Sequence, residues 1–491
     1  MTQVARRGLA ALSLATAAVA VVLVSGAGCT QDCCVSDSAP IPLARAPLGG
    51  PAAGEGAMLT RARVADTTTP FLMAVDTASP LTVLTGAASS TTPGSRGFDL
   101  LDATWADATQ PAPVRAKLRN IGVFSLPVGP AGDEATLPLG VLGGDVLRSF
   151  SVELRFGETC GDSTVDAGAT AARCSAMTLW RHQGASLAFL GSAGYATLRF
   201  TLIGGGETTA RAPADTFGIR APVTLPATRV ILRACAAPKT FSIDDPLATC
   251  CKRGDEVTPE HTSGLDLALV LATGTGPLVL SQSAWTRLQP KLPAAPVMTS
   301  GTLLIPSWPA PIAAMWSTIP RLALVDLEST PTSDPGPCVE LSRARRIRWV
   351  TNQQSMNPDT AACVQPCDVD PTEPPLALNS AAYVEIGGAL PVAVIADDEE
   401  LLQSLRFDVR PLGPEIDGLL GAGALTPTRV ELDYLTDPRR AIFSCELGTT
   451  EDVCFATARC PRLPDHSQKH TCFGLPEPIG LPSTCAPSGC Q

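Results

Sequence analysis

One pattern of residues occurs twice along the chain, and this repeat constrains the fold more than any other feature of the sequence. In each half, an apolar stretch typical of a strand runs into a short loop of small residues with threonine. The loops align without a gap, and the paired residues are Asp76 with Ala272, Thr77 with Thr273, Ala78 with Gly274 and Ser79 with Thr275. Each half later closes on a Gly-apolar-apolar-Gly motif, at 140–143 and 418–421. Two matches in the same order predict an internal duplication.

The composition favours β-structure for both units. The 45 prolines and 42 glycines stand among short apolar runs, which is typical of many short strands joined by turns. Aromatic residues make up only 4% of the chain, so small and branched aliphatic side chains must fill the core. A chain of 491 residues is too long for one compact core. We therefore expect an all-β fold with two lobes.

Composition divides the chain further. Residues 29–57 are rich in Ala, Pro, Gly and Ser with few large apolar residues, which predicts a flexible tether. Six cysteines fall between Cys445 and Cys490, which predicts a small disulfide-stapled module. The predicted segments are a signal peptide (1–28), the tether (29–57), a first β lobe with the Asp76 loop (58–200), a second β lobe with the Ala272 loop (201–444) and a disulfide-rich tail (445–491).

The first 28 residues have the three parts of a secretory signal. Arg6 and Arg7 provide the positive charge, an apolar run follows, and small residues precede Cys29. A transmembrane anchor needs about 20 predominantly apolar residues, and this run is shorter and rich in alanine. Small residues directly before a cysteine resemble the lipobox of bacterial lipoproteins, although Gly26 stands where leucine is usual. We expect lipidation of Cys29 and anchoring to the bacterial cell envelope, at the outer membrane, with cleavage after Ala27 and free secretion as the alternative.

The cysteine count agrees with export. Of 17 cysteines, 16 remain for pairing if Cys29 carries lipid, and disulfides form in oxidising compartments. Local clusters at 235–251 and 338–367 suggest bridged loops. In the tail, Cys460, His466, His470 and Cys472 have spacing that could hold zinc, but disulfides with surface histidines are the better interpretation there, so no metal site is predicted.

Charge excludes one class of partner. The net charge of -11 becomes -13 when the two signal-peptide arginines are removed, and the chain has no cluster of Lys and Arg. A protein this acidic is not expected to bind nucleic acid.

The Asp76-Thr77-Ala78-Ser79 loop, together with Val141-Leu142-Gly143, resembles the catalytic loop and the apolar-apolar-Gly motif of aspartic peptidases. The second half repeats the layout with Ala272-Thr273-Gly274-Thr275 and Leu419-Leu420-Gly421, as in the two-lobed pepsin-like members. The resemblance covers roughly 58–443 and implies paired β-barrel lobes. It implies that Asp76 is the first catalytic carboxylate with Ser79 as its hydrogen-bonding support, and that Thr77 and Thr273 brace the two loops.

The second carboxylate that this chemistry requires is missing, because Ala272 occupies its position. One carboxyl group must activate water while the other donates a proton to the substrate carbonyl, and a methyl group does neither. Asp266 lies six residues upstream, roughly 20 Å away along a strand. Asp417, which precedes the second Gly-Leu-Leu-Gly motif, is a remote candidate, and pairing of two Asp76 residues in a dimer is less favoured. The stretch that matches the flap, 114–127, has Phe124 and no tyrosine.

Three functional hypotheses follow from these residues. The first is a cell-envelope lipoprotein, monomeric and without a cofactor, that binds extended polypeptide between its lobes and has lost or weakened proteolysis. On this hypothesis, Ala272→Asp restores weak activity with an acidic optimum. The second is an active aspartic endopeptidase that uses Asp76 with an unconventional partner. The third is a structural or adhesion lipoprotein. Ser281 and Ser283 lack the context of a serine nucleophile.

Overall fold

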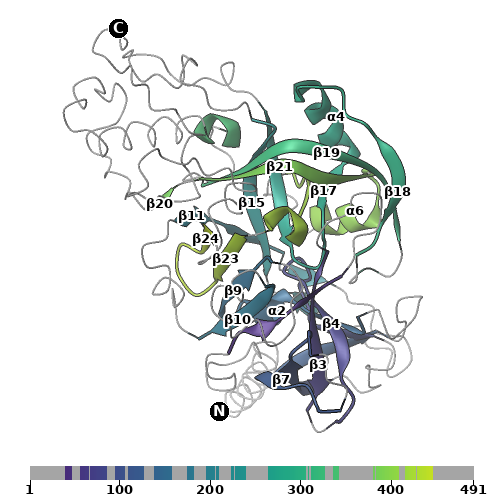
Figure 1. Ribbon diagram of the computed structural model, residues 1–491, viewed down its shortest axis with the longest axis vertical. Coiled ribbons are helices and arrows are strands. Elements are labelled where there is room, and N and C mark those ends of the chain that lie inside the picture. Colours follow the sequence, from purple (N-terminus) through teal and green to yellow (C-terminus); the bar gives the residue numbers. More distant parts are fainter. Residues whose placement is uncertain are drawn as a thin grey trace, which may run out of the picture.

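A computed structural model of the chain describes three large sheets, with one lobe at each end and a third sheet between them (Figure 1). The described residues are 39–46, 56–65, 67–85, 94–105, 109–126, 138–157, 174–181, 195–204, 206–208, 223–225, 227–238, 264–305, 308, 311–326, 336–341, 380–381, 383–407, 415–426 and 428–445. The predicted signal peptide, Cys29, the zinc-like spacing in the tail and nearly all of the tail lie outside these residues.

The first lobe is built on a seven-stranded sheet. Its strands, in spatial order, are β2 (Ala44–Arg45), β3 (Met58–Val64), β4 (Phe71–Val75), β8 (Gly140–Leu142), β5 (Val83–Thr85), β7 (Val114–Leu126) and β6 (Gly94–Leu101). The stretch expected as a flap forms β7, which pairs antiparallel with β6. A short helix, α2 (Gly144–Leu147), follows β8 directly.

The second lobe is built on an eight-stranded sheet. Its strands, in spatial order, are β12 (Thr201–Ile203), β15 (Arg229–Ala236), β16 (Leu265–Ala272), β22 (Gly418–Gly421), β17 (Leu278–Ser281), β21 (Tyr383–Ile395), β19 (Ile312–Val325) and β18 (Thr299–Leu303). Strand β16 (LDLALVLA) is buried at every position except Asp266, which explains its nearly continuous apolar sequence. Strand β19 begins with alternating buried and exposed residues, as expected where only one face is covered.

The third sheet contains strands from both halves of the chain and lies between the lobes (Figure 1). Its order is β1 (Ile41–Pro42), β10 (Ala176–Trp180), β9 (Ser151–Arg155), β23 (Thr428–Asp433), β24 (Arg440–Cys445), β11 (Tyr195–Arg199) and β20 (Ser380–Ala381). A two-stranded pair, β13 (Gly206–Thr208) and β14 (Val223–Leu225), stands apart. Helices among the described residues also include α4 (Gln282–Leu288), η5 (Gln289–Lys291), α6 (Glu400–Phe407) and η7 (Ala422–Leu425), and residues 337–341 are helical as well.

The registers of the two lobe sheets establish the duplication residue by residue. In the first lobe, Val75 on β4 pairs in parallel with Leu142 on β8. In the second, Leu271 on β16 pairs in parallel with Leu420 on β22. Strand β5 pairs antiparallel with β8, and β17 pairs antiparallel with β22 in the equivalent register. The all-β, two-lobed fold expected from the sequence is confirmed, and Ala272 is the structural equivalent of Asp76.

Part of the segment predicted as a flexible tether lies inside the fold. Ile41 and Leu43 are fully buried, β1 pairs with β10, and β2 pairs with β3. The backbone of Leu43 also donates to the carbonyl oxygen of Ser175 (2.9 Å). Two large apolar side chains and edge hydrogen bonds are enough to order this short stretch, although its composition is poor in core-forming residues.

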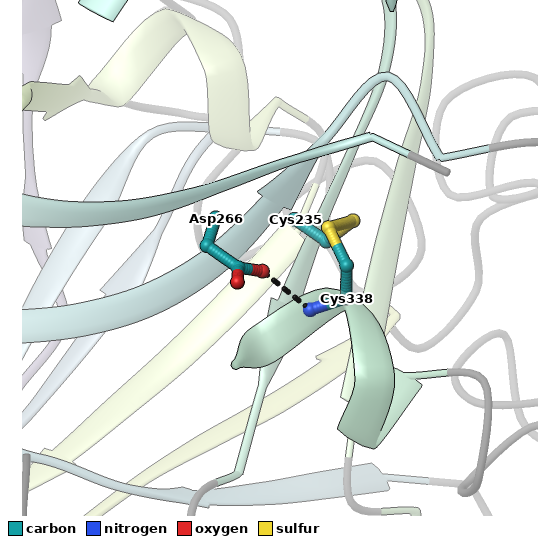
Figure 2. The surroundings of a disulfide bond; sticks show 3 residues. All are labelled: Cys235, Asp266 and Cys338. Atoms are coloured by element: carbon teal, nitrogen blue, oxygen red, sulfur yellow. Dashed lines mark hydrogen bonds between the residues drawn. A yellow bond between two sulfur atoms is a disulfide. The ribbon is translucent and has the colours of Figure 1, made fainter. Parts of the chain in front are cut away.

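One disulfide joins two cysteine clusters that the sequence suggested would pair locally. Cys235 on β15 is bonded to Cys338, 103 residues away. Figure 2 shows this bond beside Asp266, whose Oδ1 accepts a hydrogen bond from the backbone N–H of Cys338 (2.7 Å). The pairing therefore ties a distant segment to strand β15, and the expectation of a local bridge for Cys235 is wrong. In the part of the chain that the structure describes, no helix has the length and apolarity needed to cross a membrane.

Candidate functional site

Two equivalent loops meet at the boundary between the lobes. The Asp76 loop follows β4, and the Ala272 loop follows β16. Both strands are buried apolar runs, so each loop begins where the run changes to small and hydroxyl-bearing residues. The backbone N–H of Met58 donates to the carbonyl oxygen of Thr273 (3.0 Å), which ties the first lobe to the loop of the second.

Two threonines hold the loops together by reciprocal hydrogen bonds. The hydroxyl of Thr77 donates to the carbonyl oxygen of Leu271, and that of Thr273 donates to the carbonyl oxygen of Val75, both at 2.7 Å. Each hydroxyl also accepts from the backbone N–H of the other threonine, at 3.1 and 3.3 Å. Both side chains are fully buried, so these four bonds lock the loops in a fixed relative position.

Asp76 is held at this junction with 5% of its surface exposed. Its Oδ1 accepts hydrogen bonds from the backbone N–H groups of Ala78 (2.9 Å) and Gly274 (3.3 Å). A Cβ atom on Gly274 would lie 2.6 Å from the carboxyl carbon of Asp76, closer than real Cβ contacts allow. Glycine is therefore required at position 274 if the second loop is to approach the carboxylate.

The last residue of each loop, Ser79 or Thr275, binds the segment that follows the Gly-apolar-apolar stretch of its own lobe. The carbonyl oxygen of Ser79 accepts from the N–H of Gly144 (2.8 Å), and that of Thr275 accepts from the N–H of Ala422 (2.7 Å). The hydroxyl of Ser79 donates to the carbonyl oxygen of Leu81 (2.9 Å). The suggested support of Asp76 by Ser79 stays a prediction.

Ala272 faces an apolar environment. It is 1% exposed and belongs to a cluster of buried aliphatic side chains of the second lobe, against which Ala78 packs. A methyl group at the position equivalent to a carboxylate can neither hold nor donate a proton. The junction therefore consists of two structurally equivalent loops, of which only the first has a carboxylate at this position.

Neither of the two alternative carboxylates considered from the sequence is engaged with Asp76 in the bonds that the structure shows. Asp417 accepts from the backbone N–H of Ala268 (2.8 Å) and forms an ion pair with Arg287. Asp266 binds the backbone of Cys338 (Figure 2). Both lie at the far end of β16, four to six residues from Ala272 in sequence register, or roughly 13–20 Å along the strand. Partial desolvation of exposed Asp266 and burial of Asp417 raise the pKa of each carboxyl group, while the hydrogen-bond partner of each opposes the shift.

Arg229 is the residue of this site that sequence reasoning missed. It begins β15, is 8% exposed, and its Nε–H donates to the carbonyl oxygen of Ala78 (2.7 Å). Burial lowers the pKa of its guanidinium to about 10, and the negative charge of Asp76 opposes that shift. The group remains cationic at neutral and acidic pH. One arginine at a strand start, 151 residues from Ala78, leaves no local signal in the sequence.

A further buried carboxylate lies beneath the first loop. Oδ1 of Asp145 on α2 accepts from the hydroxyl of Thr82 (2.7 Å), and that hydroxyl accepts from the N–H of Gly143 (3.1 Å). Burial raises the pKa of Asp145, while hydrogen bonds from Thr82 and Val146 oppose the shift. This group fastens the loop to the helix that follows it.

Two other features that could have had a functional role, Ser281 and a cavity, lie apart from the site. Ser281 caps α4 by accepting from the N–H of Ala284 (3.1 Å), which is a structural role. A cavity of about 670 Å³ is lined mainly by residues 292–297 and 316–320 of the second lobe and contains none of the loop residues. Within the described ranges, no group of three or more His, Cys, Asp or Glu side chains is arranged to hold a metal ion.

No family model matches the sequence, and no curated protein matches it. The solved structures to which this chain is similar include the following three. The aspartic proteinase from Irpex lacteus has 10% identity and a TM-score of 0.32, and the match covers 85% of this chain and 99% of that one. The basic 7S globulin from soybean has 11% identity and a TM-score of 0.33, with 84% and 96% covered. The structure of edgp has 11% identity and a TM-score of 0.32, with 84% and 95% covered.

These identities and TM-scores are too low to carry conclusions about activity. The all-β, two-lobed architecture is established by the chain's own strand registers. At the junction of the lobes, the structure brings together Asp76, Ala272, the two threonines and Arg229.

Proposed function

We propose that this chain is an exported, lipid-anchored protein that binds extended polypeptide between its two lobes without cleaving it. The observation that carries the proposal is the junction itself, where the Asp76 loop and the threonine bonds are retained while Ala272 stands in the equivalent position. Paired loops of this kind resemble those of pepsin-like peptidases, whose substrates are polypeptides. The retained bracing supports a binding role, and Ala272 argues against hydrolysis.

Peptide hydrolysis by this arrangement needs a base and an acid at one place. A carboxylate takes a proton from water, and a second carboxyl group donates one to the peptide oxygen. Asp76 alone supplies only one of the two. Asp266 and Asp417 are bound to groups at the other end of β16, and the charged neighbour that acts with Asp76 is a cation, Arg229.

A cleavage assay tests the loss of catalysis directly. The purified mature chain is incubated at acidic pH with an unfolded protein, with and without pepstatin, beside the Asp76→Ala variant. We expect no pepstatin-sensitive cleavage and no difference between the two proteins. Cleavage by the natural chain that pepstatin inhibits and Asp76→Ala abolishes would show an active endopeptidase and overturn the proposal.

Binding is tested separately with a library of fluorescent extended peptides, measured by polarisation. We expect saturable binding that Gly274→Leu weakens, because a side chain at position 274 would collide with Asp76 and displace the loops. The matched control is a leucine substitution at the exposed position 297, which lines a cavity of the second lobe that contains none of the loop residues. A chain that folds but binds no peptide would favour a structural or adhesion lipoprotein instead.

The membrane anchor is part of the same proposal. The signal-like residues 1–28 and the small residues before Cys29 support it, and the disulfide between Cys235 and Cys338 fits an oxidising compartment. The chain between Cys29 and the buried Ile41 can span at most about 40 Å, so a lipid on Cys29 would keep the lobes close to the membrane. Mass spectrometry of the mature N-terminus should find acylated Cys29. An unmodified residue after Ala27 would indicate free secretion.

A further inference from the structure

The position of Arg229 is set by the duplicated fold. Strand β15 pairs with β16 in the same register in which β3 pairs with β4. Arg229 is therefore the second-lobe equivalent of Ala57, which precedes β3 and is 3% exposed. The first lobe has a methyl group where the second has a guanidinium. This asymmetry is the reverse of the one in the loops, where the first lobe has Asp76 and the second has Ala272.

Two contacts with the first lobe fix the guanidinium beside the loop of Asp76. Its Nε–H is bound to the carbonyl oxygen of Ala78, two residues beyond Asp76. The preceding residue, Thr228, is fully buried against Gly144, where an added Cβ would lie 2.6 Å from the Thr228 Cβ. Asp76 is the charged group that acts on Arg229. The cation is thus held near the carboxylate by tight packing, in addition to the attraction of opposite charges.

We infer that Arg229 is a second determinant of the loss of proteolysis, independent of Ala272, because it neutralises Asp76 and would prevent two carboxylates at this junction from sharing a proton. This inference rests on the proposed function. It revises an expectation drawn from the sequence: Ala272→Asp alone restores no activity, and the charge of Arg229 must also be removed.

The reason lies in the proton count of the reaction. One carboxylate takes a proton from water as the water oxygen bonds to the peptide carbonyl carbon, while the other carboxyl group gives its proton to the carbonyl oxygen. The C–N bond of the tetrahedral intermediate then breaks as the nitrogen receives a proton. Mutual repulsion of the two negative charges keeps one of the two carboxyl groups protonated before the reaction, so that it can donate to the carbonyl oxygen. A guanidinium beside them favours ionisation of both, which leaves a base without its acid.

The first experiment compares cleavage of an unfolded protein by four full-length chains over a range of acidic pH. They are Ala272→Asp, Arg229→Gln and the double variants Ala272→Asp/Arg229→Gln and Ala272→Asp/Arg229→Ala. Glutamine keeps a hydrogen-bond donor for Ala78 and removes the charge, while alanine copies the residue of the first lobe. We expect pepstatin-sensitive cleavage in the double variants and none in either single variant. Equal activity in Ala272→Asp and the double variants would overturn the inference.

The second experiment does not depend on activity. In Ala272→Asp/Arg229→Gln, two carboxylates face each other without a cation, so one pKa of the pair is raised above its value in the unfolded chain. A raised carboxyl pKa stabilises the fold at low pH, and this stability is lost as the pH rises through it. The Tm difference between this variant and Arg229→Gln should therefore become more unfavourable from about pH 4 to about pH 7. The difference between Ala272→Asp and the natural chain should change much less.

The outcomes separate the two proposals. A pH-dependent loss of Tm confined to the double variant supports the role of Arg229, even if cleavage is not regained. The same loss in Ala272→Asp alone contradicts it. Pepstatin-sensitive cleavage by the natural chain that Asp76→Ala abolishes would instead refute the loss of catalysis, and it is tested without any change at Arg229 or Ala272.

Discussion

Replacing Thr77 with valine should strongly destabilise the junction of the lobes. The substitution keeps the shape of the side chain and removes its hydroxyl. It leaves two buried groups without the partners they have in the natural chain, the carbonyl oxygen of Leu271 and the backbone N–H of Thr273. An orphaned buried polar group costs about 1–3 kcal/mol. For the two groups together we expect a loss of about 3 kcal/mol in the free energy of unfolding, in the lower half of the combined range, because the loops can relax slightly.

The change is measured as Tm by differential scanning calorimetry at one pH and scan rate. For a unit the size of one lobe, about 3 kcal/mol corresponds to a fall of roughly 6–12 °C. Thr273→Val should cause a similar fall, because it orphans the carbonyl oxygen of Val75 and the N–H of Thr77. The two threonines belong to one hydrogen-bond network, so the fall in Tm of the double variant should differ from the sum of the two single effects.

Thr60→Val is the matched control for this experiment. Thr60 is also a fully buried threonine of the first lobe, but its hydroxyl makes one long hydrogen bond, 3.4 Å, to the neighbouring carbonyl oxygen of Arg61. Its replacement should cost less than about 1 kcal/mol. If Thr77→Val and Thr60→Val shift Tm equally, the reciprocal threonine bonds do not hold the lobes together and the reasoning is refuted.

Three further changes probe the surroundings of the junction. Asp145→Asn keeps an acceptor for Thr82 and removes a carboxyl group whose raised pKa stabilises the fold at low pH, an effect that is lost as the pH rises. The Tm of the variant, relative to the natural chain, should therefore improve from about pH 4 to about pH 7. No change in this difference would contradict the argument that burial raises the pKa of Asp145. Gly274→Ala should lower Tm by several degrees because its Cβ collides with the carboxyl group of Asp76, and an unchanged Tm would show that the loops can separate freely. Ser281→Ala should cost about 1 kcal/mol through loss of the N-cap of α4, and restoration of Tm by Ser281→Asp is the check.

The equivalence of the two loops could be predicted from the sequence because the repeat is local. In the sequence alignment of the two loops, the difference in residue number between paired positions is constant, as for Asp76 and Ala272. The strand registers of β4 and β16 give the same difference. The two loops lie so close together that both need small residues and threonines. The pattern is therefore visible in both halves of the sequence, although only the first half has the carboxylate.

The segment before the first lobe could not be predicted from its composition. Few large apolar residues occur there, yet Ile41 and Leu43 are buried and their backbone extends two sheets. Composition reflects what side chains can bury, whereas this segment also gains hydrogen bonds from sheet edges that other parts of the chain provide. The pairing of Cys235 with Cys338 was equally hidden, because the cysteine spacing does not determine connectivity.

The sequence by itself determined the class of fold, the position of the two loops and the absence of a carboxylate at position 272. These follow from the strand pattern, the repeat and the identity of one residue. Only the tertiary structure decided what surrounds Asp76, because Gly274 and Arg229 reach it from parts of the chain more than 150 residues away. Charges act through space, so a buried cation beside a carboxylate can be recognised only once the lobes are folded against each other.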